Sequence, residues 1–357
     1  MKGKVAEIVY NSKVLAGIFL LAASLFTEAA PTVIGPYRLE VFARAPEGST
    51  KPDSITIDDH FNVWVSFTNG VKPDGSDHRS STVIEYDQNG TILHTYSVLG
   101  SNDGLKFNPE DGTIWALRNQ DANPALTIIH PENQTQTHYT FATPPAHHGG
   151  FDDIVFLKDR IYFSASNPTL DAHGNNLASS IVSIKIVGNT IQTAAVLRGD
   201  AYAFNVATKL PMRTVQTDPD SMTVDTLGNL VLDSQADSIL LFINNPGTYD
   251  QNVVEVPLAD ASGHPVMVDD TVFPNQSSGK IYFTDSGTNM VYVLLSHSFD
   301  IRGTGYSSSG PSIGKVTLRT GLYTPIVVGL SSSHGAIFVP AGIDQEDQGQ
   351  DQDEVED

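Results

Sequence analysis

The stretch PDSITIDDHFNVWVSF at residues 52–67 returns in altered form as PDSMTVDTLGNLVLDS at residues 219–234. The two copies match in length, in turn chemistry and in the alternation of apolar positions. Weaker copies begin at Asn102 (NDGLKFNPEDGTIWAL), Phe151 (FDDIVFLKDRIYFS) and Val268 (VDDTVFPNQSSGKIYF), and a last fragment, SHGAIFVP, begins at Ser333. Because so small a unit cannot bury both faces of its own sheet, the repetition predicts an array of small sheets packed against one another.

Each copy has the pattern of a β-hairpin followed by two more strands. In the copy at residues 219–234, Met222 and Val224 alternate, the turn Asp225–Asn229 follows, and Leu230–Leu232 returns. Aspartate opening a turn that Gly-Asn closes is typical of hairpins, because Asp bonds back to the chain and Gly or Asn accepts positive φ. Four antiparallel strands in about fifty residues form one blade of a β-propeller. The sequence therefore predicts an all-β fold, a propeller with four-stranded antiparallel blades.

The residues that open the copies set the expected number of blades. These opening residues are Asp53, Asp103, Asp152, Asp220, Asp269 and His334. Six openings predict six blades. The last copy lacks its middle strands, so we expect residues 37–43 to supply one strand and close the ring, and residues 315–319 and 325–328 to supply the others.

Composition restricts the classes of partner. A chain of 357 residues with 40% hydrophobic residues can bury a large core, and the repeats favour one domain over residues 30–343. The formal net charge of −21 argues against nucleic acid and against an anionic membrane surface. Residues 344–357 hold eight acids and no base, which predicts a disordered acidic tail.

The N-terminus has the pattern of an export signal. Lysines precede an unbroken apolar or small run from Val14 to Phe26, which is 13 residues and too short to span a bilayer, for which about 20 are needed. A small-residue cleavage site after Ala29 makes residues 1–29 a predicted signal peptide, with a short anchor or a buried helix as the alternative. We therefore expect a secreted, extracellular monomer with no membrane span in the mature chain. The absence of cysteine excludes a disulfide framework.

The opening residues are the strongest candidates for chemistry, because the chain contains no G-x-S-x-G, H-E-x-x-H or P-loop motif. In a propeller the first strand of each blade lines the central tunnel, so these side chains should meet at one mouth. Carboxylates that face one another repel, and a hard divalent cation such as Ca²⁺ relieves that repulsion with oxygen ligands. Such a cation can activate water and polarise an ester carbonyl. Alternatively, each Asp only caps a turn or bonds the next blade.

A second candidate is the segment Ala146-His147-His148-Gly149-Gly150, which runs into Phe151-Asp152-Asp153. This adjacency places one histidine near the same mouth, as a general base or a ligand. The alternative is an exposed histidine pair in a glycine-rich loop.

These motifs resemble those of the senescence-marker/gluconolactonase group of six-bladed propellers. Related NHL-type and streptogramin-lyase-like propellers share the same spacing. The resemblance rests on the stretches at 219–232 and 102–117 and covers most of residues 37–340. It implies a divalent cation at the tunnel mouth and hydrolysis of lactones or organophosphate esters.

The resemblance also implies roles for particular residues. Asp220 matches the metal-binding Asp of the family's PDG-type motif, and Asn102 and Asp103 match its NDG-type motif, which is associated with substrate contact. Asp152 stands where the family usually has an Asn ligand. The family's EGP-type glutamate has no clean counterpart, so Asp53 or His334 would have to replace it.

Together these observations predict a secreted, metal-dependent hydrolase of a small ester or lactone. Asp53, Asp152 and Asp220 are the expected metal ligands, with Ca²⁺ as the expected cation. Asn102, Asp103 and His334 would contact substrate, and His148 or Asp269 would be the base. The alternative is a non-catalytic extracellular binding module for a glycan or protein, and a carbon–oxygen lyase of the streptogramin type is a third possibility.

Overall fold

A computed structural model of the chain describes residues 30–342, and within this range it contains strands, turns and one short 3₁₀ turn, Pro131–Asn133, with no α-helix. The all-β prediction is confirmed. No helix of residues 30–342 is long and apolar enough to cross a bilayer. The predicted signal peptide at 1–29 and the acidic tail at 344–357 lie outside the described residues.

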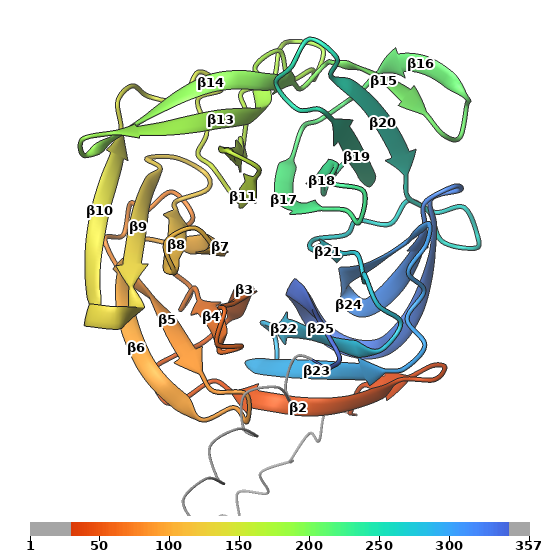
Figure 1. The fold of residues 1–357 in the computed structure, drawn as a ribbon. Helices are drawn as coiled ribbons and strands as arrows, with labels where there is room; N and C mark the ends of the chain where they lie inside the picture. Colours follow the sequence, from red (N-terminus) through yellow and green to blue (C-terminus); the bar gives the residue numbers. More distant parts are fainter. Residues whose placement is uncertain (1–29, 343–357) are drawn as a thin grey trace, which may run out of the picture. The chain divides into compact units, whose positions relative to one another are not determined.

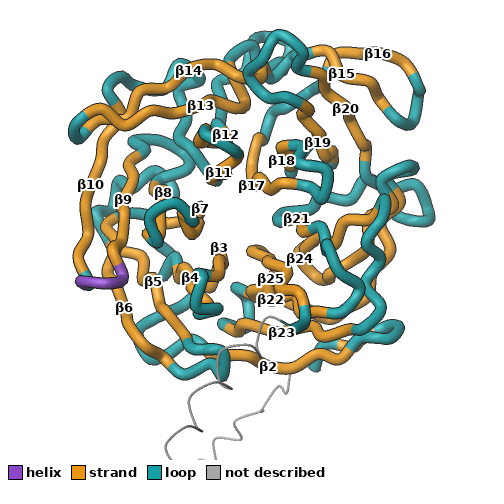
Figure 2. Tube along the Cα trace, in the orientation of Figure 1, coloured by secondary structure: helices purple, strands orange, loops and turns teal. Residues whose placement is uncertain are grey.

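The sheets stand around a central axis, in the arrangement of a β-propeller, with the first strand of each repeat innermost (Figures 1 and 2). The simplest sheet runs outward in chain order as β3 (Pro52–Ile57), β4 (Val63–Phe67), β5 (Ser80–Tyr86) and β6 (Ile92–Leu99). Turn chemistry explains its first hairpin, because Asp58 Oδ1 accepts from the backbone N–H groups of His60 and Asn62, both at 2.9 Å.

The next repeats form the same four-strand order, and parallel pairs connect or extend them at the periphery. The repeats at Asn102 and Phe151 become one sheet because β10 and β14 pair in parallel. The strands of that sheet are β7 (Asn102–Asn108), β8 (Thr113–Arg118), β9 (Ala125–His130), β10 (Thr135–Phe141), β11 (Ile154–Leu157), β12 (Arg160–Ser164), β13 (Ser179–Val187) and β14 (Thr190–Arg198).

The repeat at residues 219–234 carries an extra hairpin on its outer strand. That hairpin, β15 (Tyr202–Asn205) and β16 (Leu210–Arg213), pairs in parallel with the outermost strand of the repeat and comes from the segment 198–217, which the sequence marks as an insertion. The repeat itself consists of β17 (Pro219–Val224), β18 (Leu230–Ser234), β19 (Ile239–Asn244) and β20 (Asn252–Pro257).

The last sheet has seven strands and contains two interlocked paths. One path runs outward through β21 (Thr271–Val272), β24 (Thr304–Thr317), the first part of β25 (Leu322–Pro340) and β1 (Thr32–Val33). The other runs from the second part of β25 through β22 (Gly279–Asp285), β23 (Met290–Ser296) and β2 (Arg38–Arg44).

The strand pairing of the last sheet overturns two expectations drawn from the sequence and confirms a third. The run containing KIYF was expected to pair with the strand opening at Val268, but β22 pairs with residues 333–340 instead. Pro274 follows Phe273 directly, and its missing N–H cannot extend a ladder beyond β21. The prediction that residues 37–43 supply a strand near the end of the ring is confirmed, since β2 pairs with β23. The prediction that residues 315–319 and 325–328 supply the middle strands of the last copy is wrong, because these segments belong to β24 and the first part of β25, which pair with each other on the path that begins with β21, and β22 and β23 take that place.

Apolar side chains fill the space between neighbouring sheets. One cluster joins Val155 and Tyr162 of β11 and β12 to Met222 and Leu232 of the next repeat. All four are buried. Burial on both faces explains why the second strands, such as VWVSF at 63–67, are almost continuously apolar.

A second set of contacts joins the innermost strands directly, at the residue after each opening residue. Ser54 donates to the carbonyl oxygen of Asp103, and Ser221 donates to Asp269 Oδ1. Asp153 and Asp270 accept from the backbone N–H groups of Met222 (2.8 Å) and Ala336 (2.7 Å). Gly104 and Gly335 bring their backbones against the carbonyl groups of Asp152 and Asp53. All six positions therefore contact the next strand around the axis, and we call these contacts the inner stitches.

The glycines of the inner stitches should not tolerate a side chain. A Cβ at Gly104 or Gly335 would clash with the neighbouring carbonyl oxygen. We expect Gly104→Ala to lower the free energy of unfolding by about 3 kcal/mol, measured by urea denaturation. Gly188→Ala is the control, because its Cβ would meet nothing and only its positive φ costs about 1 kcal/mol. Equal losses in the two variants would contradict this account.

Candidate functional site

All six opening residues line one cavity of about 290 Å³ at the end of the tunnel where the inner strands begin. The structure thus brings together Asp53, Asp103, Asp152, Asp220, Asp269 and His334, as the repeat spacing predicts. Their chemical roles remain predictions. We call this space the acidic cavity.

Four of its carboxyl groups form two pairs. Asp103 lies within hydrogen-bonding reach of Asp53, and Asp152 lies within reach of Asp220. Burial, together with the neighbouring carboxylates, raises the pKa of Asp103, Asp152 and Asp220 well above the usual range. The raised pKa favours one protonated member in each pair, because burial and the neighbouring carboxylates oppose a second negative charge.

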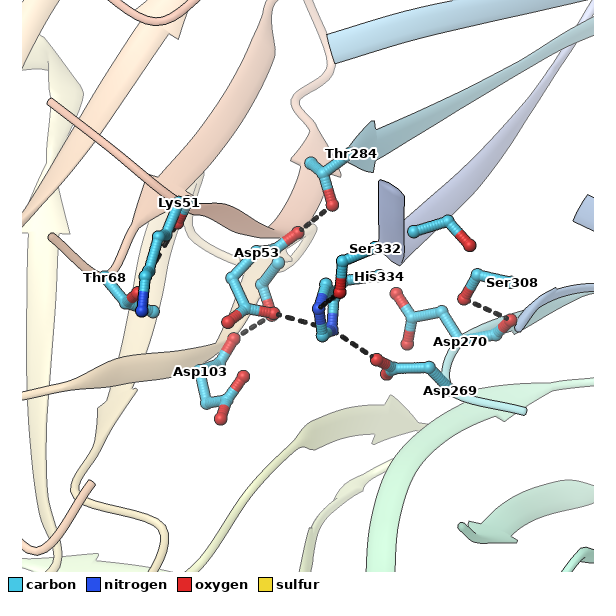
Figure 3. A network of polar contacts seen from close by, with 12 residues as sticks. Lys51, Asp53, Thr68, Asp103, Asp269, Asp270, Thr284, Ser308, Ser332 and His334 are labelled. Carbon is cyan, nitrogen blue, oxygen red and sulfur yellow. Dashed lines mark hydrogen bonds and ion pairs between the residues drawn. The ribbon is translucent and has the colours of Figure 1, made fainter. Parts of the chain in front are cut away.

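His334 lies between Asp53 and Asp269 (Figure 3). Its Nδ1 is 2.6 Å from Asp269 Oδ2 and 3.7 Å from Asp53 Oδ1, and its Nε2 is 2.9 Å from Ser332 Oγ. Burial alone would lower the pKa of this imidazole, but Asp53, Asp269 and Asp103 raise it to about 11. An imidazolium therefore neutralises the side of the cavity formed by Asp53 and Asp269. Within residues 30–342, no ion pair includes Asp103, Asp152 or Asp220.

The donor set fits a hard cation by chemistry. Besides His334 the lining offers carboxylate, amide and hydroxyl oxygens, the ligands that Ca²⁺ takes. Gln120 lines the cavity, and its buried Oε1 has no hydrogen-bond donor. A cation would satisfy such an oxygen.

The spacing of the ligand atoms fits a bound cation less well than their chemistry does. Over residues 30–342, the group of three acidic or histidine side chains with ligand atoms all within 4.8 Å is Asp58, Asp59 and His60, at an exposed turn. Asp58 already uses both oxygens there, since Oδ2 accepts from Trp64 Nε1 at 2.9 Å. The acidic cavity therefore presents paired carboxylates and no group of three at that spacing.

Two predicted site residues lie outside the lining. Asn102 is fully buried, and its Nδ2 donates to the carbonyl oxygens of Gly104 (2.9 Å) and Leu117 (2.6 Å). It precedes the opening residue, so strand alternation turns its side chain away from Asp103. His148 lines a different cavity, of about 500 Å³, and lies at the end of a turn in which its backbone N–H donates to Pro145 O. The structure does not bring either residue to the acidic cavity.

Other lining residues were not recognised from the sequence. Gln120, Ser166 and Gln235 follow the second strands β8, β12 and β18 by one or two residues. In an antiparallel hairpin the end of the second strand lies beside the start of the first. In the sequence, these lining residues could therefore have been found by their position just after each second strand.

Asp233 in β18 is a buried acid without a partner. It is 2% exposed, and within residues 30–342 neither of its carboxyl oxygens has a hydrogen-bond partner. Burial, followed by the charges of Asp220, Asp269 and Asp270, raises its pKa well above the usual value. The equivalent side chains Ser66 and Thr284 donate to carbonyl groups of the next inner strand. Asp233 must be protonated to do the same.

Because the pKa of Asp233 is raised on folding, its contribution to stability falls as pH rises above about 3.9, its unfolded value. The isosteric Asp233→Asn avoids this loss. We expect it to increase the free energy of unfolding at pH 7.5 by about 1–3 kcal/mol and to change little at pH 4. Urea denaturation at both pH values measures this, with the exposed Asp250→Asn as the control. An equal effect at both pH values would show that ionisation is not the cause.

The imidazolium state of His334 is also directly observable. Its contribution to stability is complete below the unfolded pKa of about 6.5 and is lost as pH rises through about 11. We expect nitrogen-detected NMR at pH 8, without added cation, to show both ring nitrogens protonated. His334→Gln assigns the signal. A neutral ring at pH 8 would contradict the ion pair with Asp269.

The fold is similar to that of solved enzymes of two classes. No protein-family model and no curated protein sequence matches the chain. Virginiamycin B lyase from Staphylococcus aureus aligns with a TM-score of 0.47 and 14% identity over 86% of this chain and 89% of that one. The periplasmic gluconolactonase PpgL from Pseudomonas aeruginosa aligns with a TM-score of 0.45 and 10% identity over 85% and 99%. A streptogramin B lyase gives 0.46 and 16% over 84% and 91%.

Proposed function

We propose that the chain is a six-bladed propeller of four-stranded blades, and that its acidic cavity hydrolyses a small ester or lactone with a divalent cation. The blade count follows the six four-strand paths, of which the seven-stranded sheet supplies two. The observation that carries the function is the convergence of seven aspartates and one histidine on one cavity of about 290 Å³, five of these aspartates being opening residues.

The cation would belong to the side of the cavity that His334 does not neutralise. Asp152 and Asp220 would hold it as the sequence predicts, and Asp103 would join them in place of Asp53, which lies against His334. A bound Ca²⁺ would polarise the substrate carbonyl and make water a better nucleophile. The proton held by each carboxyl pair would leave when the cation binds, so uptake should release protons.

The residues on the other side would orient substrate and handle protons. Asp269 fixes the imidazole of His334 through Nδ1, and His334 enters the reaction as a charged donor able to protonate a leaving alkoxide. Asp269 is the remaining candidate base in the cavity. The volume lies near the lower end of the usual range for ligand pockets, about 300–1,000 Å³, which favours a small substrate. We also propose a secreted, monomeric protein without a nucleic-acid partner.

Cation binding is the first test. We expect the purified protein, stripped by chelator and titrated with Ca²⁺, to bind one ion and to melt at a higher temperature, by several degrees at saturating Ca²⁺. Asp152→Asn and Asp220→Asn should abolish the shift and keep the fold, while Asp250→Asn should behave as wild type. Calorimetry in two buffers of different ionisation enthalpy would detect the released protons.

Catalysis needs its own measurement. A panel of small lactones and aryl esters, followed by mass spectrometry, separates hydrolysis, which adds one water, from the streptogramin-type elimination, which does not. Turnover that survives Asp220→Asn would exclude the acidic cavity as the site.

The alternative function, a glycan-binding module, is favoured by the spacing of the carboxylates. Among residues 30–342, the acidic cavity holds no three acidic or histidine side chains whose ligand atoms all lie within 4.8 Å of one another. Its carboxyl and amide groups suit sugar hydroxyls equally well. Absence of a Ca²⁺ response together with retention on a glycan array would support this alternative.

A further inference from the structure

The opposite end of the tunnel has a second cavity, of about 440 Å³ and of different chemistry. Its walls include the fourth residue after each opening residue, a single layer around the axis. That layer consists of Ile57, Phe107, Phe156, Val224, Phe273 and Phe338, all partly buried. We call this space the apolar cavity. Six apolar side chains at one level, four of them aromatic, line this end of the tunnel, and polar groups such as Thr56, Thr223 and Asn275 lie among them.

An ion-paired layer lies between the two cavities. Lys106 lines the apolar cavity, and its Nζ is 3.0 Å from Asp153 Oδ2. Asp153 and Asp270 are the carboxylates of the inner stitches, held by the backbone N–H groups of Met222 and Ala336. Burial alone would lower the pKa of Lys106, but Asp153, Asp270 and Asp152 raise it, so the ammonium stays charged. The acidic and apolar cavities have no lining residue in common.

The charges around Lys106 decide what kind of molecule fits. Lys106 Nζ lies 3.0 Å from Asp153 Oδ2, and because an ammonium has three N–H donors it can also donate to a ligand acceptor. Because several carboxylates surround this single ammonium, a second anion would be repelled. A neutral acceptor oxygen, such as a carbonyl, matches both the N–H donors and the local charge.

We propose that the apolar cavity is a second ligand site, which takes a neutral aromatic or aliphatic molecule with one carbonyl oxygen directed at Lys106. Hydrophobic walls with a few convergent polar groups are the usual composition of small-molecule sites. The site does not depend on the acidic cavity or on a cation.

Prodan, a neutral fluorescent naphthalene with one carbonyl, is a suitable probe. We expect its emission to shift to the blue on binding to the chelator-treated full chain, with one site per molecule. Val224→Trp and Ile57→Trp, which fill the cavity from two different strands, should each weaken binding at least tenfold. Val187→Trp is the matched control, because Val187 is exposed on β13.

The charge argument has a separate readout. A carboxylated naphthalene of similar size should bind at least tenfold more weakly than Prodan. Unchanged Prodan affinity in both filling variants, or tighter binding of the carboxylate, would overturn the proposal. All measurements use the cation-free protein, and the melting temperature of each variant confirms folding. Failure of Ca²⁺ binding or hydrolysis at the acidic cavity therefore leaves this test unaffected.

Discussion

The contact between neighbouring inner strands is the constraint on which the rest of the structure depends. Six strand starts can meet around one axis only if each approaches the next closely, and the inner stitches do this in three chemically different ways. Serine hydroxyls donate, aspartates accept, and glycines remove the side chain. Since the opening residue lies one position before each stitch, the same contacts fix where the carboxylates of the acidic cavity point.

The sequence predicts the local unit well because its signals are local. Alternation and turn residues in PDSMTVDTLGNLVL predict two strands joined by a turn, and the two strands are present as β17 and β18. The convergence of the opening residues also follows from repetition, since equivalent positions in equivalent sheets must lie at the same height. By contrast, the pairing of β22 with residues 333–340 joins segments about fifty residues apart, and no local pattern determines it.

The side chains of the site were predictable only where position alone determines them. His334 takes its charge state from Asp53 and Asp269, which belong to two different repeats. Asn102 lies in the stretch that resembles an NDG-type motif, yet its side-chain Nδ2 donates to two backbone carbonyl oxygens of its own hairpin. Lys106 stands within a quoted motif, but its partner Asp153 lies in the next repeat, so the ion pair forms only when these two repeats lie side by side.

The interlocked last sheet has a consequence for how the chain must fold. β22 and β23 are synthesised before residues 333–340, the strand that covers the inner edge of β22, while their outer neighbour β2 was made near the beginning. The inner edge of β22 therefore stays unpaired until residues 333–340 are made, and β25 then completes both paths of the last sheet at once. Closure is thus a late step of high sequence separation, which slows folding and leaves open strand edges as the most vulnerable stage for misassembly.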